Sequence, residues 1–506
     1  MSVKNIVTNV AALKAKYGTN YPIIQAALTP LIAHDRANNI VTTVYDVSDP
    51  VQMAWVKAPV VKNPADAMQF KQCFDEIIAN TNPHASMILG GPDIVPHVPV
   101  VNPAADDDSI VPSDLPYACA GRYSTSAFNF TAPSRILTRL PDIAGGTDAN
   151  YLATLLRTPV SYRQVKASSY TDTYFSPGVA DWQAELQGTL AVVFGNYSDL
   201  YLSPPNGPNW TSAQYQQQFH YINCHGSSND PSFYGQSGAS YPKAMDSPLV
   251  NGRLTNGMGS IAACCYSAQL YNPYAGGART PPLPMSNTYL QSNAIFYMGS
   301  SVICYGGSPP YNQPKNANLA ASAYAARIFA GDTIGQAMLS TWQTISASYT
   351  ATGSLLALKT LVEFMAFGDV TTAPIDVTLP GREKLEFDRT RNDALRRAQF
   401  EAIADQLAIQ PGQYDAVAMS DVGDDMLARI EGLVEADGAR SVAIAHREWV
   451  PAERSRSRPE GLVPEARRLH LVRARSREES IFEFDLLYEI FEIDGEIVSV
   501  DIYPRR

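Results

Sequence analysis

Two short apolar segments each end in a side chain suited to nucleophilic chemistry. Residues 219–228 run through Phe, His, Tyr and Ile to His225, and residues 260–268 run through Ile and Ala to two cysteines. Each segment predicts a buried strand of about five residues that stops at a loop of small residues. Parallel neighbouring strands bring their carboxyl ends to one edge of a sheet, where open α/β folds place their sites. We therefore expect a cysteine nucleophile beside a histidine base.

These residue types have complementary roles. A cysteine attacks as the thiolate, yet its ordinary pKa of about 8.5 leaves little thiolate at neutral pH, so a nearby imidazole must take the proton or lower that pKa. Gly226 follows His225 and has no side chain to keep a substrate carbonyl away from the backbone. The N–H groups of Gly226 and of the cysteine are thus predicted to form an oxyanion hole.

Cys264 and Cys265 compete for the role of nucleophile. Successive strand residues point to opposite faces, so only one of them should reach His225. A zinc site made of Cys224, His225, Cys264 and Cys265 is a weaker alternative, because adjacent strand residues diverge and the chain lacks a Cys-x-x-Cys spacing there. Otherwise, a pair of cysteines in a buried strand is ordinary core packing.

Further short motifs lie along the chain between residues 87 and 369. They are the strand and Gly-Gly-Pro-Asp turn at 87–96, Ser113-Asp114 with Tyr117, Gly121-Arg122-Tyr123 followed by Arg139-Leu140-Pro141, and the apolar-Gly-Asp run at 364–369. With the His-Gly-Ser of 225–227, they resemble in type and order the motifs of the caspase-like (clan CD) cysteine peptidases, closest to the gingipain family. Val370 stands where that family has a proline. The resemblance covers about residues 85–375.

The resemblance implies a fold and site residues. It implies a caspase-like α/β fold, with a mainly parallel sheet flanked by helices and two side-by-side α/β subdomains. The small-residue turn after Cys265 is similar to the family's turn after the nucleophile, which favours Cys265 over Cys264. Tyr305 lies where gingipains line the pocket for the residue before the cut, although an ordinary loop tyrosine fits equally well.

Substrate preference and cofactors follow from the same resemblance. Gingipains cut after arginine or lysine, and an arginine pocket needs a carboxylate, for which Asp172 and Asp181 are candidates. The resemblance requires no cofactor and no catalytic metal. It leaves the acid that would orient His225 unassigned.

A change of composition near residue 380 predicts a separate domain at 379–506, because residues 381–506 carry 19 Lys/Arg and 26 Asp/Glu, far more densely than the rest. The resemblance to gingipains implies two subdomains before it, at 1–165 and 166–378. The net charge of −11 argues against nucleic-acid binding. The sequence contains no apolar run long enough to span a membrane and no secretory signal, so we expect a cytoplasmic protein.

Local patterns predict the elements. Helices are expected at 24–38, 65–79, 318–329, 333–348 and 383–409, and strands at 40–47, 85–89, 189–194, 294–304, 414–419 and 441–445. A hairpin turning at Asp494-Gly495 is expected for 481–503. The arginine-rich segment 447–477 is either a solvated loop or an inhibitory or processing segment. The charged C-terminal domain is thus expected to be α+β.

The sequence therefore predicts a cysteine endopeptidase that cuts protein or peptide substrates with a Cys265–His225 dyad. It is expected to be latent until processed, with a regulatory protein or an activating protease as a further partner. Bacterial defence or cell-death signalling would suit such an intracellular enzyme. The alternative is a catalytically inactive caspase-like scaffold that binds a protein partner.

Overall fold

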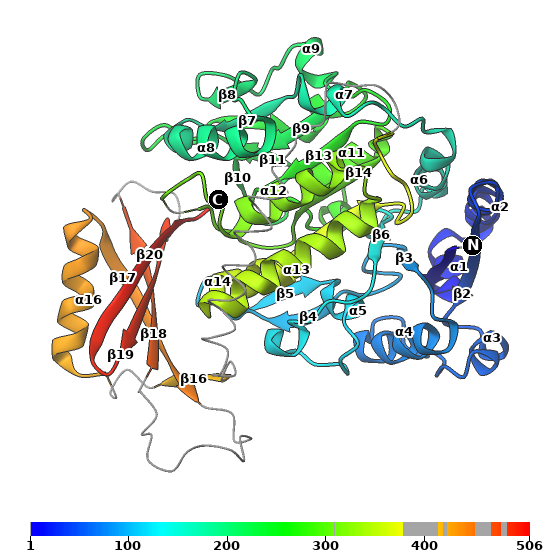
Figure 1. The fold of residues 1–506 in the computed structure, drawn as a ribbon. Helices are drawn as coiled ribbons and strands as arrows, with labels where there is room; N and C mark the ends of the chain where they lie inside the picture. Colours follow the sequence, from blue (N-terminus) through cyan, green and yellow to red (C-terminus); the bar gives the residue numbers. More distant parts are fainter. Residues whose placement is uncertain (1, 308, 378–412, 418–421, 451–466, 477–482) are drawn as a thin grey trace.

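The computed structural model is organised around one eight-stranded sheet (Figure 1). It describes residues 2–307, 309–377, 413–417, 422–450, 467–476 and 483–506. The strand order is β2-β1-β3-β6-β15-β14-β13-β9. Neighbours are parallel throughout except at β14 and β15, which are antiparallel. The carboxyl ends of β9, β13 and β14 therefore meet at one edge, and those of the other five strands at the opposite edge.

The N-terminal part of the chain supplies half of this sheet. Its strands are β1 (Ser2–Thr8), β2 (Ile40–Asp46), β3 (Ala85–Leu89) and β6 (Leu137–Leu140). Its helices are α1 (Val10–Tyr17), α2 (Tyr21–Ala37), α3 (Pro50–Trp55), α4 (Ala67–Thr81), α5 (Leu115–Ala118) and α6 (Ala149–Ser161), with short 3-10 turns at Gly18–Asn20 and Ala127–Phe130. A separate hairpin is made by β4 (Val98–Val101) and β5 (Ile110–Ser113). The predicted helices and strands of residues 24–89 are confirmed within a few residues.

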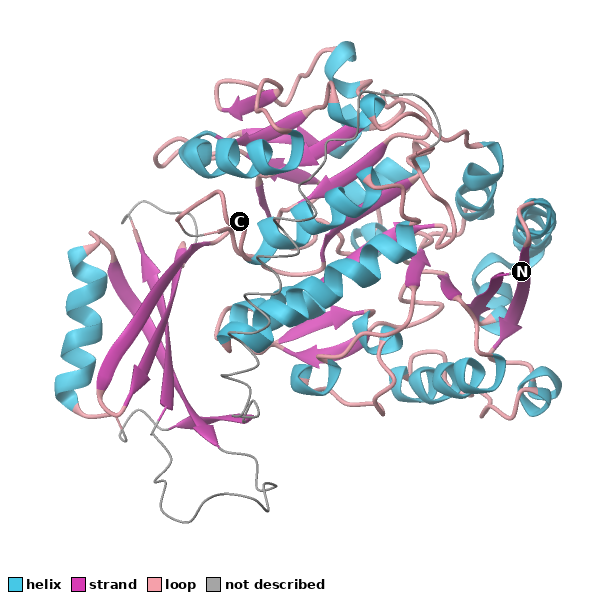
Figure 2. Ribbon diagram, viewed as in Figure 1, coloured by secondary structure: helices cyan, strands magenta, loops and turns pink. Residues whose placement is uncertain are grey.

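The second half carries the two segments that the sequence singled out. Its strands are β7 (Ser176–Val179), β8 (Leu200–Ser203), β9 (Phe219–Ile222), β10 (His225–Gly226), β11 (Ser232–Tyr234), β12 (Lys243–Asp246), β13 (Gly259–Ala262), β14 (Phe296–Ser300) and β15 (Phe364–Gly368). Its helices are α7 (Ser168–Thr171), α8 (Gln183–Phe194), α9 (Ser212–Tyr215), α10 (Ser247–Val250), α11 (Met285–Gln291), α12 (Asn316–Phe329), α13 (Ile334–Thr352) and α14 (Leu355–Glu363), with 3-10 turns at Ala180–Trp182 and Pro273–Gly276. Helices flank the sheet, and α12 and α13 cross in front of it in Figure 2.

The prediction of a strand at 189–194 is wrong, because these residues form the last part of helix α8. The buried positions of α8 include Glu185, Leu186, Thr189, Leu190 and Val193, which recur at helical spacing. Gly195 ends the helix with φ 74°. A short apolar run does not by itself distinguish a strand from a buried helical segment. Here the residues before the run belong to the same helix.

A buried arginine joins several of the motif stretches in the N-terminal half. The Arg139 guanidinium donates to both carboxylate oxygens of Asp114 and to the carbonyl oxygens of Gly90 and Val95 at 2.5–2.8 Å. His97 Nδ1 lies 2.8 Å from the same carboxylate. Burial alone would raise the pKa of Asp114, but the charges of Arg139 and His97 lower it overall. These motif residues therefore fasten the turn after β3 to strand β6.

Arg139→Met is expected to lower the free energy of unfolding by about 4 kcal/mol, because it leaves a buried carboxylate without its charged partner. Lys243→Met is the control. It breaks a surface ion pair with Asp246, in which Lys243 is 46% exposed, and should cost less than about 1 kcal/mol. Urea titration followed by tryptophan fluorescence measures both. A loss below 1 kcal/mol for Arg139→Met would contradict a structural role for this network.

The C-terminal part forms a separate antiparallel sheet of order β16-β17-β18-β19-β20. Its strands are β16 (Gln413–Val417), β17 (Arg440–Val450), β18 (Arg467–Arg475), β19 (Leu486–Ile493) and β20 (Glu496–Pro504), and helix α16 (Asp424–Ala436) covers one face. The hairpin turning at Asp494-Gly495 is confirmed. The solvated-loop interpretation of 447–477 is wrong at its ends, which belong to β17 and β18, whereas 451–466 and the helix expected at 383–409 lie outside the described residues.

This sheet docks onto the larger part through specific contacts. Glu489 accepts hydrogen bonds from Ser354 Oγ at 2.6 Å and from the Leu356 N–H at 3.1 Å, at the start of α14. Lys315 pairs with Asp501 at 2.7 Å. Burial raises the pKa of Glu489 to about 7. These contacts hold the last strand, β20, beside the carboxyl ends of β13 and β14.

None of the helices in the described part of the chain combines the length and the apolar character that crossing a bilayer would need.

Candidate active site

The register of two parallel strands brings His225 and Cys265 to the same place. Ile222 of β9 pairs with Ala262 of β13, and His225 and Cys265 each follow three residues later. Gly226 lies directly on the cysteine backbone, since a Cβ at this glycine would stand 1.8 Å from the Cys265 carbonyl oxygen. A residue with any side chain would push the two loops apart. The structure thus assembles His225, Gly226 and Cys265 at one edge of the sheet.

Cys265 sits at a tight, left-handed turn. Tyr266, the next residue, has φ 56°, an uncommon conformation for a side chain of this size. The Cys304 N–H donates to Cys265 Sγ at 3.3 Å. Burial by itself would raise the pKa of the thiol, but hydrogen bonding from Cys304 and the positive charges of Arg505 and Lys359 lower it overall. Lowering of this kind favours the thiolate.

Cys264 points elsewhere. Its Sγ accepts a hydrogen bond from the Cys224 N–H at 3.2 Å and lies 3.7 Å from the Ile222 carbonyl oxygen. Burial raises the pKa of this thiol well above its ordinary value. Cys264 therefore points in among the strands and Cys265 toward the edge of the sheet. This matches the alternation of side chains that the sequence predicted.

His225 is oriented by an amide. Its Nε2 lies 2.8 Å from Gln236 Oε1, and the Gln236 amide nitrogen donates to the Gly238 carbonyl oxygen and to the Tyr241 hydroxyl. With the amide held this way, Nε2 carries the hydrogen and Nδ1 is the basic nitrogen. The Trp182 ring packs edge-on against the imidazole, 4.5 Å between centroids. Burial and the positive charges of Arg506 and Arg505 lower the pKa of His225 to about 3, so the ring is neutral at pH 7.

Residues 503–506, here named the tail, run into this site from the end of β20; the label C in Figure 1 marks their position. The tail lies antiparallel to residues 304–306. The Arg506 N–H donates to the Cys304 carbonyl oxygen, and the Gly306 N–H donates to the Pro504 carbonyl oxygen, both at 3.1 Å. The Arg506 carbonyl oxygen contacts Cys265 Sγ. This is how an extended peptide adds to an exposed strand edge, with one carbonyl group presented to the thiol.

The Arg506 side chain fills a closed pocket. Its guanidinium donates to the Glu185 carboxylate and, at 2.7 Å, to Asn223 Oδ1, and it stacks over the Trp182 ring at 4.8 Å. Gly306 forms one wall, because a Cβ there would stand 2.8 Å from both Nη2 of Arg506 and Oε1 of Glu185. Arg506 has no exposed surface. The pocket therefore matches a guanidinium group in charge and shape.

Glu185 is held in place by two further donors. Its Oε1 accepts hydrogen bonds from the Gly307 N–H at 2.6 Å and from Asn318 Nδ2 at 2.5 Å. It lies in the first turn of α8, directly after the carboxyl end of β7, which extends the sheet beyond β9 through backbone hydrogen bonds. The pocket is thus built by the same sheet edge as the thiol.

The residues that the sequence suggested for a substrate pocket have other partners. Asp172 is exposed at the end of α7, and Asp181 accepts from the Gly238 N–H at 3.1 Å, so neither takes the place of Glu185. The backbone of Tyr305 pairs with Arg505 of the tail. The Tyr305 hydroxyl donates to Asp106 at 3.0 Å. Gln236, Asn223 and Trp182 were not identified from the sequence.

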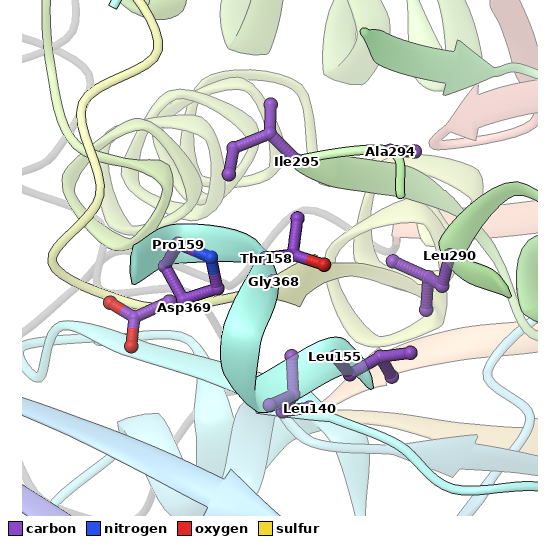
Figure 3. Close-up of a pocket in the computed structure, with 9 residues that line it drawn as sticks. All are labelled: Leu140, Leu155, Thr158, Pro159, Leu290, Ala294, Ile295, Gly368 and Asp369. Atoms are coloured by element: carbon purple, nitrogen blue, oxygen red, sulfur yellow. The ribbon is translucent and has the colours of Figure 1, made fainter. Parts of the chain in front are cut away.

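A small hollow lies at the opposite edge of the sheet (Figure 3). It is lined mainly by apolar side chains between the end of β6 and the start of β14, including Leu140, Leu155 and Ile295. Its acid, Asp369, is already paired with Lys4. The hollow offers no nucleophile, and it is unrelated to the thiol site.

Two residues of the zinc alternative already have different partners, because Cys264 Sγ accepts from the Cys224 N–H whereas Cys265 Sγ contacts the Arg506 carbonyl oxygen. A group of three or more potential metal ligands was not found among the described residues. Comparison of the chain with models of known protein families and with curated proteins gave no match.

Proposed function

We propose that the protein is a cysteine endopeptidase that cuts after arginine. The observation that carries this proposal is the tail itself, which lies along 304–306 as an extended peptide with its Arg506 carbonyl at the Cys265 thiol. A peptide from another protein, bound the same way, would bring its own arginyl carbonyl group to the sulfur. The resemblance to caspase-like peptidases supports the same interpretation.

The proposed reaction follows the two-step course of thiol peptidases. Cys265 Sγ attacks the carbonyl carbon while His225 Nδ1 receives the thiol proton. The N–H groups of Gly226 and Cys265 stabilise the resulting oxyanion. The C–N bond breaks, His225 gives its proton to the leaving amine, and a thioester remains. Water, deprotonated by His225, then hydrolyses the thioester and restores the thiol and a carboxylate product.

Arginine preference is supported by the pocket around Arg506. Glu185 and Asn223 satisfy two different guanidinium nitrogens, and Trp182 covers its face. A fully buried carboxylate needs a cation, which excludes aspartate and apolar side chains from this pocket. Lysine would reach the carboxylate but would lose the stacking contact and the second hydrogen bond.

Latency is supported by the same contacts, since the tail fills the site that a substrate needs. The inhibitory role that the sequence suggested for 447–477 is thus proposed instead for residues 503–506. The docked C-terminal sheet holds the tail at a high effective concentration next to the thiol.

Labelling with an arginyl acyloxymethyl ketone tests the function. The full-length chain carrying Arg506→Ala, which weakens the tail, should gain one label by intact-protein mass spectrometry. The label should survive Cys264→Ala and disappear with Cys265→Ala. Loss of the label with Cys264→Ala alone would make Cys264 the nucleophile. An unlabelled chain, with or without Arg506, would favour a catalytically inactive scaffold.

A further inference from the structure

The residue before Arg506 also has a charged partner. Arg505 Nη1 donates to Asp107 Oδ2 at 2.9 Å, and its guanidinium stacks over Phe484 at 5.2 Å. The Arg505 side chain is 11% exposed. Because successive residues of an extended strand point to opposite faces, Arg505 leaves the tail on the side opposite to the Glu185 pocket. The tail therefore places two consecutive arginines on two different carboxylates.

Asp107 differs from the acids on either side of it. Asp106 is paired with the buried Lys359 and accepts from the Tyr305 hydroxyl, and Asp108 accepts from the Ile303 N–H and the Tyr266 hydroxyl. Those two acids fix the loop to the sheet edge. Asp107 is left 34% exposed and faces the tail. The contacts of its two neighbours hold the loop on which Asp107 lies.

The Asp107 carboxylate has room for two cations. Arg473 of β18 donates to Oδ1 at 3.2 Å, while Arg505 takes Oδ2. Removing Arg505 alone would therefore leave one oxygen available for the side chain of an incoming peptide, with Phe484 beside it. An acid at this position favours a basic side chain and repels an acidic one.

We propose that Asp107 selects a second basic residue immediately before the arginine at the cut, so that the substrates are polypeptides with two consecutive basic residues. This inference rests on the proposed function, since it assigns a second subsite to the same cleft. Cleavage after such a pair uses the Glu185 pocket for the arginine at the cut and Asp107 for the basic residue preceding it.

Binding and cleavage of matched peptides test the inference in the full-length Arg505→Ala/Arg506→Ala chain. For binding, Cys265→Ala is added, and calorimetry compares the peptide Tyr-Pro-Arg-Arg with Tyr-Pro-Ala-Arg. We expect about tenfold tighter binding of the first, because it gains a charged hydrogen bond. Asp107→Asn should remove that difference, whereas Asp172→Asn, a change of an exposed acid at the end of α7, should leave it in place.

Cleavage of the same two sequences as fluorogenic amides, with Cys265 intact, separates the inference from the proposed function. Cleavage of both at equal rates, or an unchanged preference in Asp107→Asn, would overturn the second subsite while leaving an arginine-specific peptidase. Preferential binding of the diarginine peptide without any cleavage would support the subsite and refute the peptidase.

Discussion

The full-length chain carrying Arg506→Ala is expected to hydrolyse arginyl peptides about 100-fold faster than the unaltered chain at low substrate concentration. In the proposed function the tail acts as a tethered competitor, and short tethers give effective concentrations in the millimolar range. Arg506 supplies its main anchor, through Glu185, Asn223 and Trp182. Initial rates with a fluorogenic arginyl amide measure the gain.

The matched control for this experiment is Arg429→Ala. Arg429 lies on α16 of the same C-terminal domain and forms an exposed ion pair with Glu496, so its removal tests whether the loss of any arginine in that domain activates the chain. Its rate should stay within about twofold of the unaltered chain, because exposed ion pairs contribute little. Equal rates for Arg506→Ala and the unaltered chain would mean that the tail does not compete with substrates.

The gain should come mainly as a lower apparent KM. A tethered competitor reduces the fraction of molecules with an open site, and a substrate at high concentration overcomes it. Docking through Glu489 and Lys315 fixes the sheet that carries the tail, so the competitor stays tethered after it leaves the pocket. A raised kcat with an unchanged KM would instead indicate that Arg506 distorts the catalytic residues.

The residues near the thiol could be predicted from the sequence because the determinants are local. Two apolar segments that end in His-Gly and in Cys-x-Ser specify two strand ends, and the parallel register of β9 and β13 then aligns His225 with Cys265. Strand alternation indicated that only one of the two cysteines would face His225, and the resemblance of the turn at Tyr266 to the family's turn favoured Cys265. Both arguments use neighbours within a few positions along the chain.

The pocket could not be predicted because its parts are distant in the sequence. Glu185 was overlooked because the apolar run after it reads equally well as a strand, which would have left no helix to place the acid at the sheet edge. The tail reaches the cleft only because the hairpin β19–β20 docks through Glu489 onto α14. Neither contact has a local signature. The direction of the Tyr305 side chain depends in the same way on the register of 304–306 against the tail.

Glu185→Gln, introduced into the Arg506→Ala chain, is expected to lower kcat/KM for arginyl peptides by about 100-fold. Glutamine keeps the size and the hydrogen-bond acceptor but removes the charge, and breaking a buried charged pair costs about 3 kcal/mol. The Arg506→Ala background is needed because Glu185 also anchors the tail. Fluorogenic arginyl amides measure the loss.

A citrullyl peptide is the matched substrate, because citrulline has the shape of arginine without its charge. The Arg506→Ala chain should prefer arginine over citrulline strongly, and Glu185→Gln should remove most of that preference by slowing only the arginyl peptide. Asp172→Asn, which changes the exposed acid that the sequence had suggested for this pocket, should leave both rates unchanged. An arginine preference that survives Glu185→Gln would show that another acid binds the guanidinium, and the tail would then no longer represent the way substrates bind.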